Sequence, residues 1–225
     1  MTLGAWQALF ADWRVFAAGL EHTLLAAALA LVFASIIGVI IGLLGVAPLP
    51  AARAISRIYV ESIRNTPLLL QAFFFYYGLP RVHVMLPVLA VGVVSLSIYT
   101  GAFVAEVVRG GIQSVARGQL EAAYSQGFRF VQAMRYIVLP QALRVIIPPY
   151  TNQCVNLVKN TQILSLIAGA DLLYQADTWS SENLLYGVAY VTVAVLYLAI
   201  TLPLATVSRW LERRIGGPIE ARADA

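Results

Sequence analysis

The stretch from Glu121 to Pro140 reads EAAYSQGFRFVQAMRYIVLP, and it is the longest part of the chain that lacks an apolar run long enough to cross a membrane. Hydrophobic segments lie on both sides of it. Its first half, residues 118–126, favours a short helix, because Ala122 and Ala123 are good helix formers and Glu121 lies near the N-terminal end, where a negative charge meets the positive end of the helix dipole. Gly127 then permits a turn with a positive φ angle.

The second half of the stretch predicts another short helix. Apolar residues recur at helical spacing from Phe130 to Val138, with Arg129 and Arg135 on other faces. Pro140 is expected to end this helix, because proline lacks the N–H that a helix interior needs. Two short helices at an angle, with small residues on the first, indicate a docking element.

Composition places the chain in a membrane. Of its 225 residues 60% are hydrophobic and only 12% are charged, whereas soluble domains carry about 25% charged residues. The single cysteine, Cys154, excludes an internal disulfide, and the two histidines, His22 and His83, stand far apart. The sequence therefore predicts no metal site and no cofactor.

The predicted fold is an all-α membrane protein with five transmembrane helices in one domain, residues 1–225. Apolar segments long enough to span a bilayer occur within residues 23–52, from about 58 to 80, and at 85–108, 145–170 and 188–208. Residues 1–20, with Trp6, Phe10, Trp13 and Phe16, predict an interfacial helix. Residues 171–187 predict a polar loop with Trp179 at its centre, in which Asp171 is a solvated helix end or a contact for an incoming ammonium group.

The arginines indicate the orientation. They gather in the loop around Arg53 and Arg57, in residues 109–144 and in the tail 209–225. Because basic loops stay in the cytoplasm, the 109–144 loop and the C-terminus are predicted to be cytoplasmic, and residues 1–20 to lie outside. This distribution gives no reason to expect a nucleic-acid partner.

Polar residues interrupt the fourth predicted span. Asn152, Asn156, Lys159 and Asn160 fall on one stripe of a helix, with Thr161 just beyond it. One interpretation is that these side chains act as glue, forming hydrogen bonds between packed helices. The other is that they line a substrate path. A lysine there costs roughly 2.5–3.5 kcal/mol to insert, so it needs a wet cavity or a partner. Glu61 and Glu106 are the candidate partners.

The second predicted span contains Thr66 and Pro67. Proline inside a span frees a backbone carbonyl, which is tolerated where protein or water covers it. The site is either a simple kink or a broken turn whose backbone groups bind the carboxylate or ammonium group of a substrate, with Gln71 one turn further on.

Nucleotide-binding and enzymatic motifs are missing from the chain. A P-loop needs Gly-Lys followed by Ser or Thr, but the only lysine, Lys159, stands between Val158 and Asn160. The sequence therefore predicts a protein that is not an enzyme. If its function depends on ATP, the nucleotide site belongs to another polypeptide.

The Glu121-Ala122-Ala123 triplet, Gly127 and the sequence Ile137 to Pro140 together resemble the EAA loop of the membrane subunits of ABC importers. Residues 61–71 and 156–161 are similar to the polar amino acid branch of these permeases. The resemblance implies that the loop docks in a cleft of a separate ATPase subunit. The residues that would couple the two subunits are Glu121, Ala122, Ala123, Gly127, Leu139 and Pro140.

The resemblance also implies the partners and the location. They are an ATPase subunit, an extracytoplasmic amino acid-binding protein and a second permease, identical or different, in a bacterial cytoplasmic membrane. The substrate path would include Thr66, Pro67, Gln71, Asn152, Asn156, Lys159, Asn160 and Thr161. Residues 168–175, AGADLLYQ, are most similar to glutamine or glutamate systems. The alternatives are a secondary transporter coupled to ions through Glu61, Glu106 or Asp171, and a membrane scaffold without transport.

Overall fold

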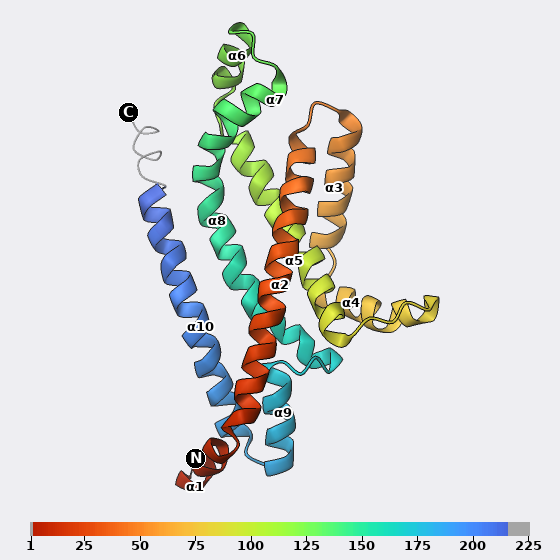
Figure 1. Cartoon of the computed structure of the whole chain (residues 1–225), viewed down its shortest axis with the longest axis vertical. Coiled ribbons are helices and arrows are strands. Elements are labelled where there is room, and N and C mark those ends of the chain that lie inside the picture. Colours follow the sequence, from red (N-terminus) through yellow and green to blue (C-terminus); the bar gives the residue numbers. More distant parts are fainter. Residues whose placement is uncertain (1, 216–225) are drawn as a thin grey trace.

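A computed structural model describes residues 2–215, in which every regular element is a helix (Figure 1). The α-helices are α1 (Leu3–Ala11), α2 (Trp13–Val46), α3 (Pro50–Arg64), α4 (Leu68–Phe73), α5 (Val88–Gln113), α6 (Arg117–Ser125), α7 (Phe130–Ala133), α8 (Leu139–Asn160), α9 (Leu172–Asn183) and α10 (Tyr186–Ile215). π-Helical turns at Phe74–Gly78 and Met134–Val138 and 3₁₀ turns at Leu79–Val82 and Thr161–Ile167 connect some of them.

Four helical stretches among the described residues are long and apolar enough to cross a membrane. They are Trp13–Val46, Val88–Gln113, Phe130–Ile167 and Tyr186–Arg214. This confirms an all-helical membrane protein. The predicted span from about 58 to 80 is not one helix, because α3 ends at Arg64 and α4 begins after Pro67. Proline disfavours the helical conformation of the residue before it and provides no N–H for the ladder.

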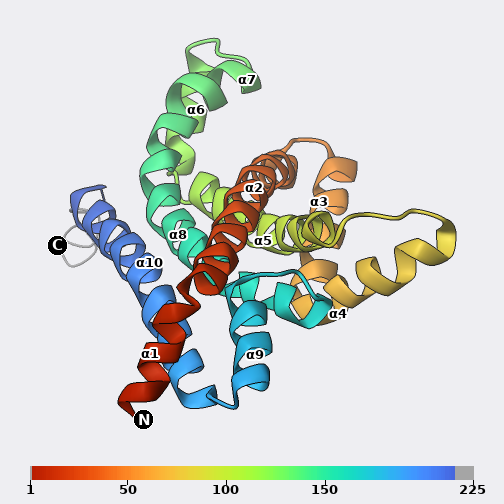
Figure 2. The ribbon, with the colours of Figure 1, turned by 60° about the horizontal axis from the view of Figure 1, so that its bottom comes forward.

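The centre of the molecule is the crossing of α2 and α5, with α3 on one side and α8 on the other (Figures 1 and 2). Gly42 makes the close approach possible: a Cβ atom there would stand 2.7 Å from the Cβ of Val108 and 2.8 Å from the carbonyl oxygen of Ala105. Gly38 meets Val104 in the same way one turn earlier. Such small residues let helix backbones pack tightly.

The predicted interfacial helix over residues 1–20 is partly wrong. α1 ends at Ala11, and α2 already begins at Trp13. Phe16 is fully buried, with its ring edge-on to Trp179 at 5.5 Å between centroids. The indole N–H of Trp179 donates to the Asp12 carboxylate at 2.8 Å. Trp179 belongs to α9, so the segment predicted as a polar loop is instead a helix with one buried face.

The described chain begins at one end of the molecule, and the opposite end is formed by α6 and α7 (Figure 1). α1 and α9 lie together at one end, whereas α6, α7 and the end of α10 lie toward the other. α5 and α8 connect α6 and α7 to the middle of the structure.

Candidate functional site

The α6–α7 segment stands clear of the long helices at one end of the molecule (Figure 1). α6 ends in the turn that the sequence predicts, since Gly127 has a φ of +83°. The N–H of Gly127 donates to the carbonyl of Tyr124 at 2.9 Å, and that of Phe128 to the carbonyl of Ala123 at 3.1 Å. This pair of bonds is the Schellman arrangement that commonly closes a helix.

The EAA residues of α6 divide between two faces. Ala123 is 1% exposed, whereas Glu121 and Ala122 face outward. The predicted position of Glu121 near the helix N-terminus is wrong, because α6 begins at Arg117 and places the carboxylate in the second turn. Within residues 2–215 this carboxylate forms no salt bridge. Glu121 and Ala122 thus present an exposed surface, and the Glu121 carboxylate has no ion-pair partner among residues 2–215.

Pro140 does not end a helix, contrary to the sequence prediction. A π-helical turn, Met134–Val138, leads from α7 directly into α8, and Pro140 lies in the first turn of α8. Proline is tolerated in a first helical turn, where its missing N–H is not needed. Leu139 is half-buried beside it. The helical path from Phe130 to Ile167 is therefore unbroken, and it joins the α6–α7 segment to the middle of the molecule.

A cavity of about 370 Å³, which we call the middle cavity, lies between α5 and α8. It brings together three of the polar residues predicted from the sequence, namely Asn156, Lys159 and Asn160. Its other lining residues are Gln153 from α8 and Tyr99, Thr100 and Phe103 from α5. The α5 residues were not predicted, although Tyr99 and Phe103 are four apart and so share a helix face.

Asn152 and Thr161 lie outside this cavity. The hydroxyl of Ser208 on α10 donates to the Asn152 amide oxygen at 3.0 Å, which is the helix-to-helix contact that the glue interpretation predicts. Thr161 is fully buried, and its hydroxyl donates to the carbonyl of Val158 at 2.7 Å. The predicted polar stripe therefore divides into a packing part and a cavity part.

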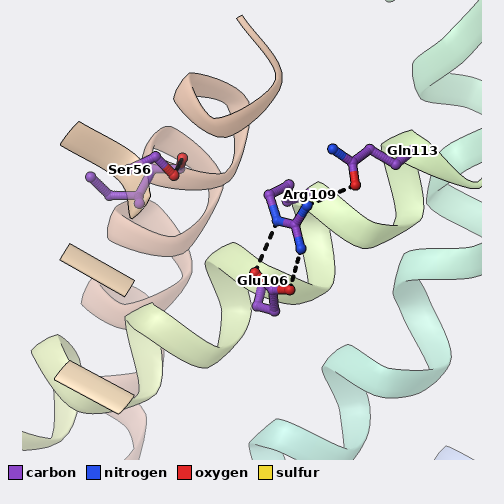
Figure 3. A network of polar contacts seen from close by, with 5 residues as sticks. Ser56, Glu106, Arg109 and Gln113 are labelled. Atoms are coloured by element: carbon purple, nitrogen blue, oxygen red, sulfur yellow. Dashed lines mark hydrogen bonds and ion pairs between the residues drawn. The ribbon is translucent and has the colours of Figure 1, made fainter. Parts of the chain in front are cut away.

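Lys159 is exposed to the middle cavity and forms no salt bridge within the described residues. Glu106, one of the two candidate partners, pairs instead with Arg109, whose Nε donates to one carboxylate oxygen at 3.0 Å and whose Nη2 donates to the other. Arg109 also donates to the Gln113 amide oxygen at 2.7 Å (Figure 3). The expected pairing with Glu61 is also absent from the described residues.

Thr66, Pro67 and Gln71 form the break between α3 and α4. The Gln71 amide nitrogen donates to the carbonyls of Ile63 and Thr66, each at 3.0 Å. The Thr66 hydroxyl donates to the carbonyl of Ser62 at 2.8 Å. Gln71 thus satisfies the Thr66 carbonyl and adds a second bond to the Ile63 carbonyl, which also accepts from the backbone N–H of Thr66 at 3.3 Å. None of the three predicted residues lines the middle cavity.

Asp171 is a buried helix cap rather than a solvated helix end. Its carboxylate accepts from the backbone N–H of Leu173 at 3.3 Å and of Tyr174 at 3.2 Å, at the start of α9. The residue is 0% exposed. Burial raises the pKa of Asp171 to about 6, against the lowering effect of the backbone hydrogen bonds. The cap fixes the start of α9 and lies outside the middle cavity.

Comparisons with known proteins agree with this arrangement. Residues 34–217 match the family described as the binding-protein-dependent transport system inner membrane component. The probable glutamine ABC transporter permease protein GlnM of Bacillus subtilis (strain 168) is 46% identical over 207 residues, or 92% of this chain and 96% of the relative. The glutamine transport system permease protein GlnP of Escherichia coli (strain K12) is 32% identical over 212 residues, or 93% and 97%.

A solved structure has the same fold. The crystal structure of an amino acid ABC transporter with histidines superposes with a TM-score of 0.87 at 35% identity, covering 95% of this chain and 100% of that chain. Members of this family work with an ATPase and a binding protein, and the secondary-transporter and scaffold alternatives are thereby excluded. The chain belongs to the inner membrane permease subunits of binding-protein-dependent ABC transporters, in their polar amino acid branch.

Proposed function

We propose that this permease imports glutamine, or a closely related polar amino acid, by alternating access powered by a separate ATPase. The choice of glutamine as substrate rests on the 46% identity to a probable glutamine permease over 92% of the chain. The chain provides the path and the docking surface, and the ATPase provides the energy.

The α6–α7 segment is the proposed coupling element. Glu121 and Ala122 face outward to meet the ATPase, while buried Ala123 anchors α6 and Gly127 forms its closing turn. Leu139 and Pro140 begin α8 without a break. Since α8 also carries the residues of the middle cavity, closure of the ATPase dimer would move coupling segment and cavity wall as one body.

The middle cavity is the proposed substrate path. Its volume of about 370 Å³ lies within the range of small-molecule pockets. The amides of Asn156 and Asn160 can both donate and accept hydrogen bonds, and the Lys159 ammonium can bind a carboxylate. Asn152 and Thr161 support these residues by packing. For Thr66, Pro67 and Gln71, a contribution to the path stays a prediction.

The proposed topology adds a fifth crossing to the four long helices. α3 and the segment Leu68–Val82 would cross the membrane together as a broken helix, supported by Gln71 at the break. The arginines favour residues 1–20 outside and the coupling segment and tail 209–225 in the cytoplasm. A second permease would complete the enclosure of the path.

Uptake by proteoliposomes tests this function. The permease, its ATPase and its binding protein are reconstituted together, with ATP inside or outside the vesicles, and the entry of labelled glutamine is measured. We expect entry that requires the ATPase and ATP on its side, and competition by unlabelled glutamine. Entry that follows an imposed proton or sodium gradient without ATP would contradict the proposal.

A further inference from the structure

Three cavities follow one another along α5. The middle cavity is lined by Tyr99, Thr100 and Phe103 of this helix. A second cavity of about 360 Å³ is lined by Phe103, Glu106, Val107 and Gly110, and a third of about 470 Å³ by Glu106, Arg109 and Gln113. The residues of the middle and second cavities share one face of α5, toward α8, whereas Arg109 and Gln113 belong to the neighbouring face, toward α2 and α3, whose residues form the other walls of the third cavity. We call the third the end cavity, because it lies toward the α6 end of α5 (Figure 1).

Neighbouring cavities share lining residues at their junctions. Phe103 and Gln153 line both the middle and the second cavity, and Arg64 and Glu106 line both the second and the end cavity. The guanidinium carbon of Arg64 lies 5.1 Å from the centre of the Phe103 ring. One cation–π contact therefore joins the two junctions.

Other contacts hold this arrangement in place around Arg64. The Glu106 carboxylate forms its salt bridge with Arg109 (Figure 3). Within residues 2–215, Arg64 forms no salt bridge. Arg64 is also the last residue of α3, directly before the break. Its side chain is exposed, lies over the Phe103 ring and is close enough to Glu106 for an attraction between the two charges. A cation–π contact is weak enough to be broken and remade during a transport cycle.

We propose that Arg64 and Phe103 form an inner gate between the middle cavity and the end cavity. With the pair in contact, the charged guanidinium and the aromatic ring lie across the route along α5. When α3 and α5 separate, the pair parts and the route opens toward the α6 end. This inference rests on the proposed function, since it takes the middle cavity as the place from which substrate leaves.

Cysteine accessibility tests the gate. Asn156→Cys, made in a Cys154→Ser background, places a thiol in the middle cavity of the complete transporter. A membrane-impermeant maleimide is added from the α6 side without ATP, and the labelling rate is measured. The gate variants are Arg64→Ala and Phe103→Leu. The control is Arg57→Ala, which removes the same charge from the lining of the end cavity and lies away from both junctions.

We expect Arg64→Ala and Phe103→Leu each to speed labelling by about two- to five-fold, which is the shift that loss of a cation–π contact of 0.5–1 kcal/mol gives when the open state is rare. The double variant should be no faster than either single variant, and Arg57→Ala should match the parent. An unchanged rate in both gate variants, or the same increase in Arg57→Ala, would overturn the gate. If Arg64→Ala does not assemble, Phe103→Leu decides alone.

Protection of residue 156 by glutamine distinguishes a failure of the gate from a failure of the substrate path. Glutamine should slow labelling at residue 156 in the parent protein if the middle cavity is the path. Protection combined with rates that do not respond to Arg64 or Phe103 refutes the gate and leaves the path standing. Labelling that is absent, or insensitive to glutamine, in every condition refutes the path and the gate with it.

Discussion

Two exposed glycines of the coupling segment, Gly118 inside α6 and Gly127 just beyond its end, differ in backbone conformation. At Gly118 and at Gly127 no heavy atom lies within 4 Å of the position that a Cβ would take, but only Gly127 has a positive φ, +83°. A substitution at Gly127 is therefore strained by its backbone and not by crowding. The sequence predicted this turn because glycine is the usual residue at such a helix end.

Replacement of Gly127 by valine should cost about 1–2 kcal/mol in the turn, since a residue with a Cβ is disfavoured in the left-handed region. The permease should still insert, while transport and substrate-stimulated ATP hydrolysis both fall. Both activities are measured in the reconstituted complex. Gly118→Ala is the matched control and should behave as wild type. Full stimulation of ATP hydrolysis in Gly127→Val would show that this turn is not needed for coupling.

Asn152 and Asn156, one helical turn apart, should respond differently to alanine. Asn152→Ala removes the acceptor of the Ser208 hydroxyl and should lower stability by about 0.6–2 kcal/mol, as interhelical hydrogen bonds in membranes do. Asn156→Ala should leave the melting temperature unchanged, because Asn156 lines a cavity. It should instead alter the rate of glutamine uptake. A lower melting temperature in Asn156→Ala with normal uptake would contradict this division.

Asp171 predicts a pH dependence of stability. Burial raises the pKa of this carboxyl from 3.8 to about 6 in the folded state, so the folded protein binds the proton more tightly than the unfolded chain. The stabilisation from proton binding by Asp171 is complete below its unfolded-state pKa of 3.8, and it is lost as the pH rises through the folded-state pKa of about 6. A pKa change of this size corresponds to about 3 kcal/mol.

Asp171→Asn keeps an acceptor for the α9 backbone and cannot ionise. Its melting temperature should exceed that of wild type at about pH 7.5 and converge with it near pH 4. Asp177→Asn, an exposed change on the same helix, controls for surface charge. A higher melting temperature for wild type than for Asp171→Asn at about pH 7.5 would show that the hydrogen bonds of the charged cap outweigh the cost of burying its charge.

At the scale of elements, hydropathy predicted the long helices well because apolar length is a local property of the sequence. Hydropathy alone predicted one span over residues 58–80, whereas Pro67 indicated a kink or a broken turn, and the structure has the break, with Gln71 donating to the carbonyls of Ile63 and Thr66. Hydropathy also missed α9, whose buried face depends on Asp12 and Phe16 from the other end of the chain. These partners of α9 lie more than 150 residues away in the sequence, so the burial of its face could not be read from residues 172–183 alone.

The contact between α2 and α5 depends on Gly42. Gly42→Ala should destabilise the protein by about 1–3 kcal/mol, because the added methyl meets the backbone oxygen of Ala105 as well as Val108. The free energy of unfolding is measured in detergent. Gly110→Ala, a glycine of α5 with nothing within 4 Å, should be neutral or slightly stabilising. Equal stability of the two variants would show that α2 and α5 do not depend on this close approach.

At the scale of the whole molecule, the EAA pattern predicted the family and the coupling segment, and the comparisons confirm the family. The polar residues of α8 were found from their spacing, but spacing alone could not separate Asn156, which lines the middle cavity, from Asn152, which bonds to Ser208 on α10. The cavity also needs Tyr99 and Phe103 from α5. Which helix faces which is decided by packing between segments far apart in the sequence.

Coupling requires the ATPase to dock on the outward face of α6, and co-purification of the two subunits measures this docking. Ala122→Trp adds bulk to an exposed position of α6, and Leu184→Trp adds it to a residue that is 76% exposed at the other end of the molecule. We predict that Ala122→Trp loses the ATPase subunit and substrate-stimulated ATP hydrolysis, while Leu184→Trp retains the ATPase. A stable complex of the Ala122→Trp permease with normal stimulated hydrolysis would contradict the central claim.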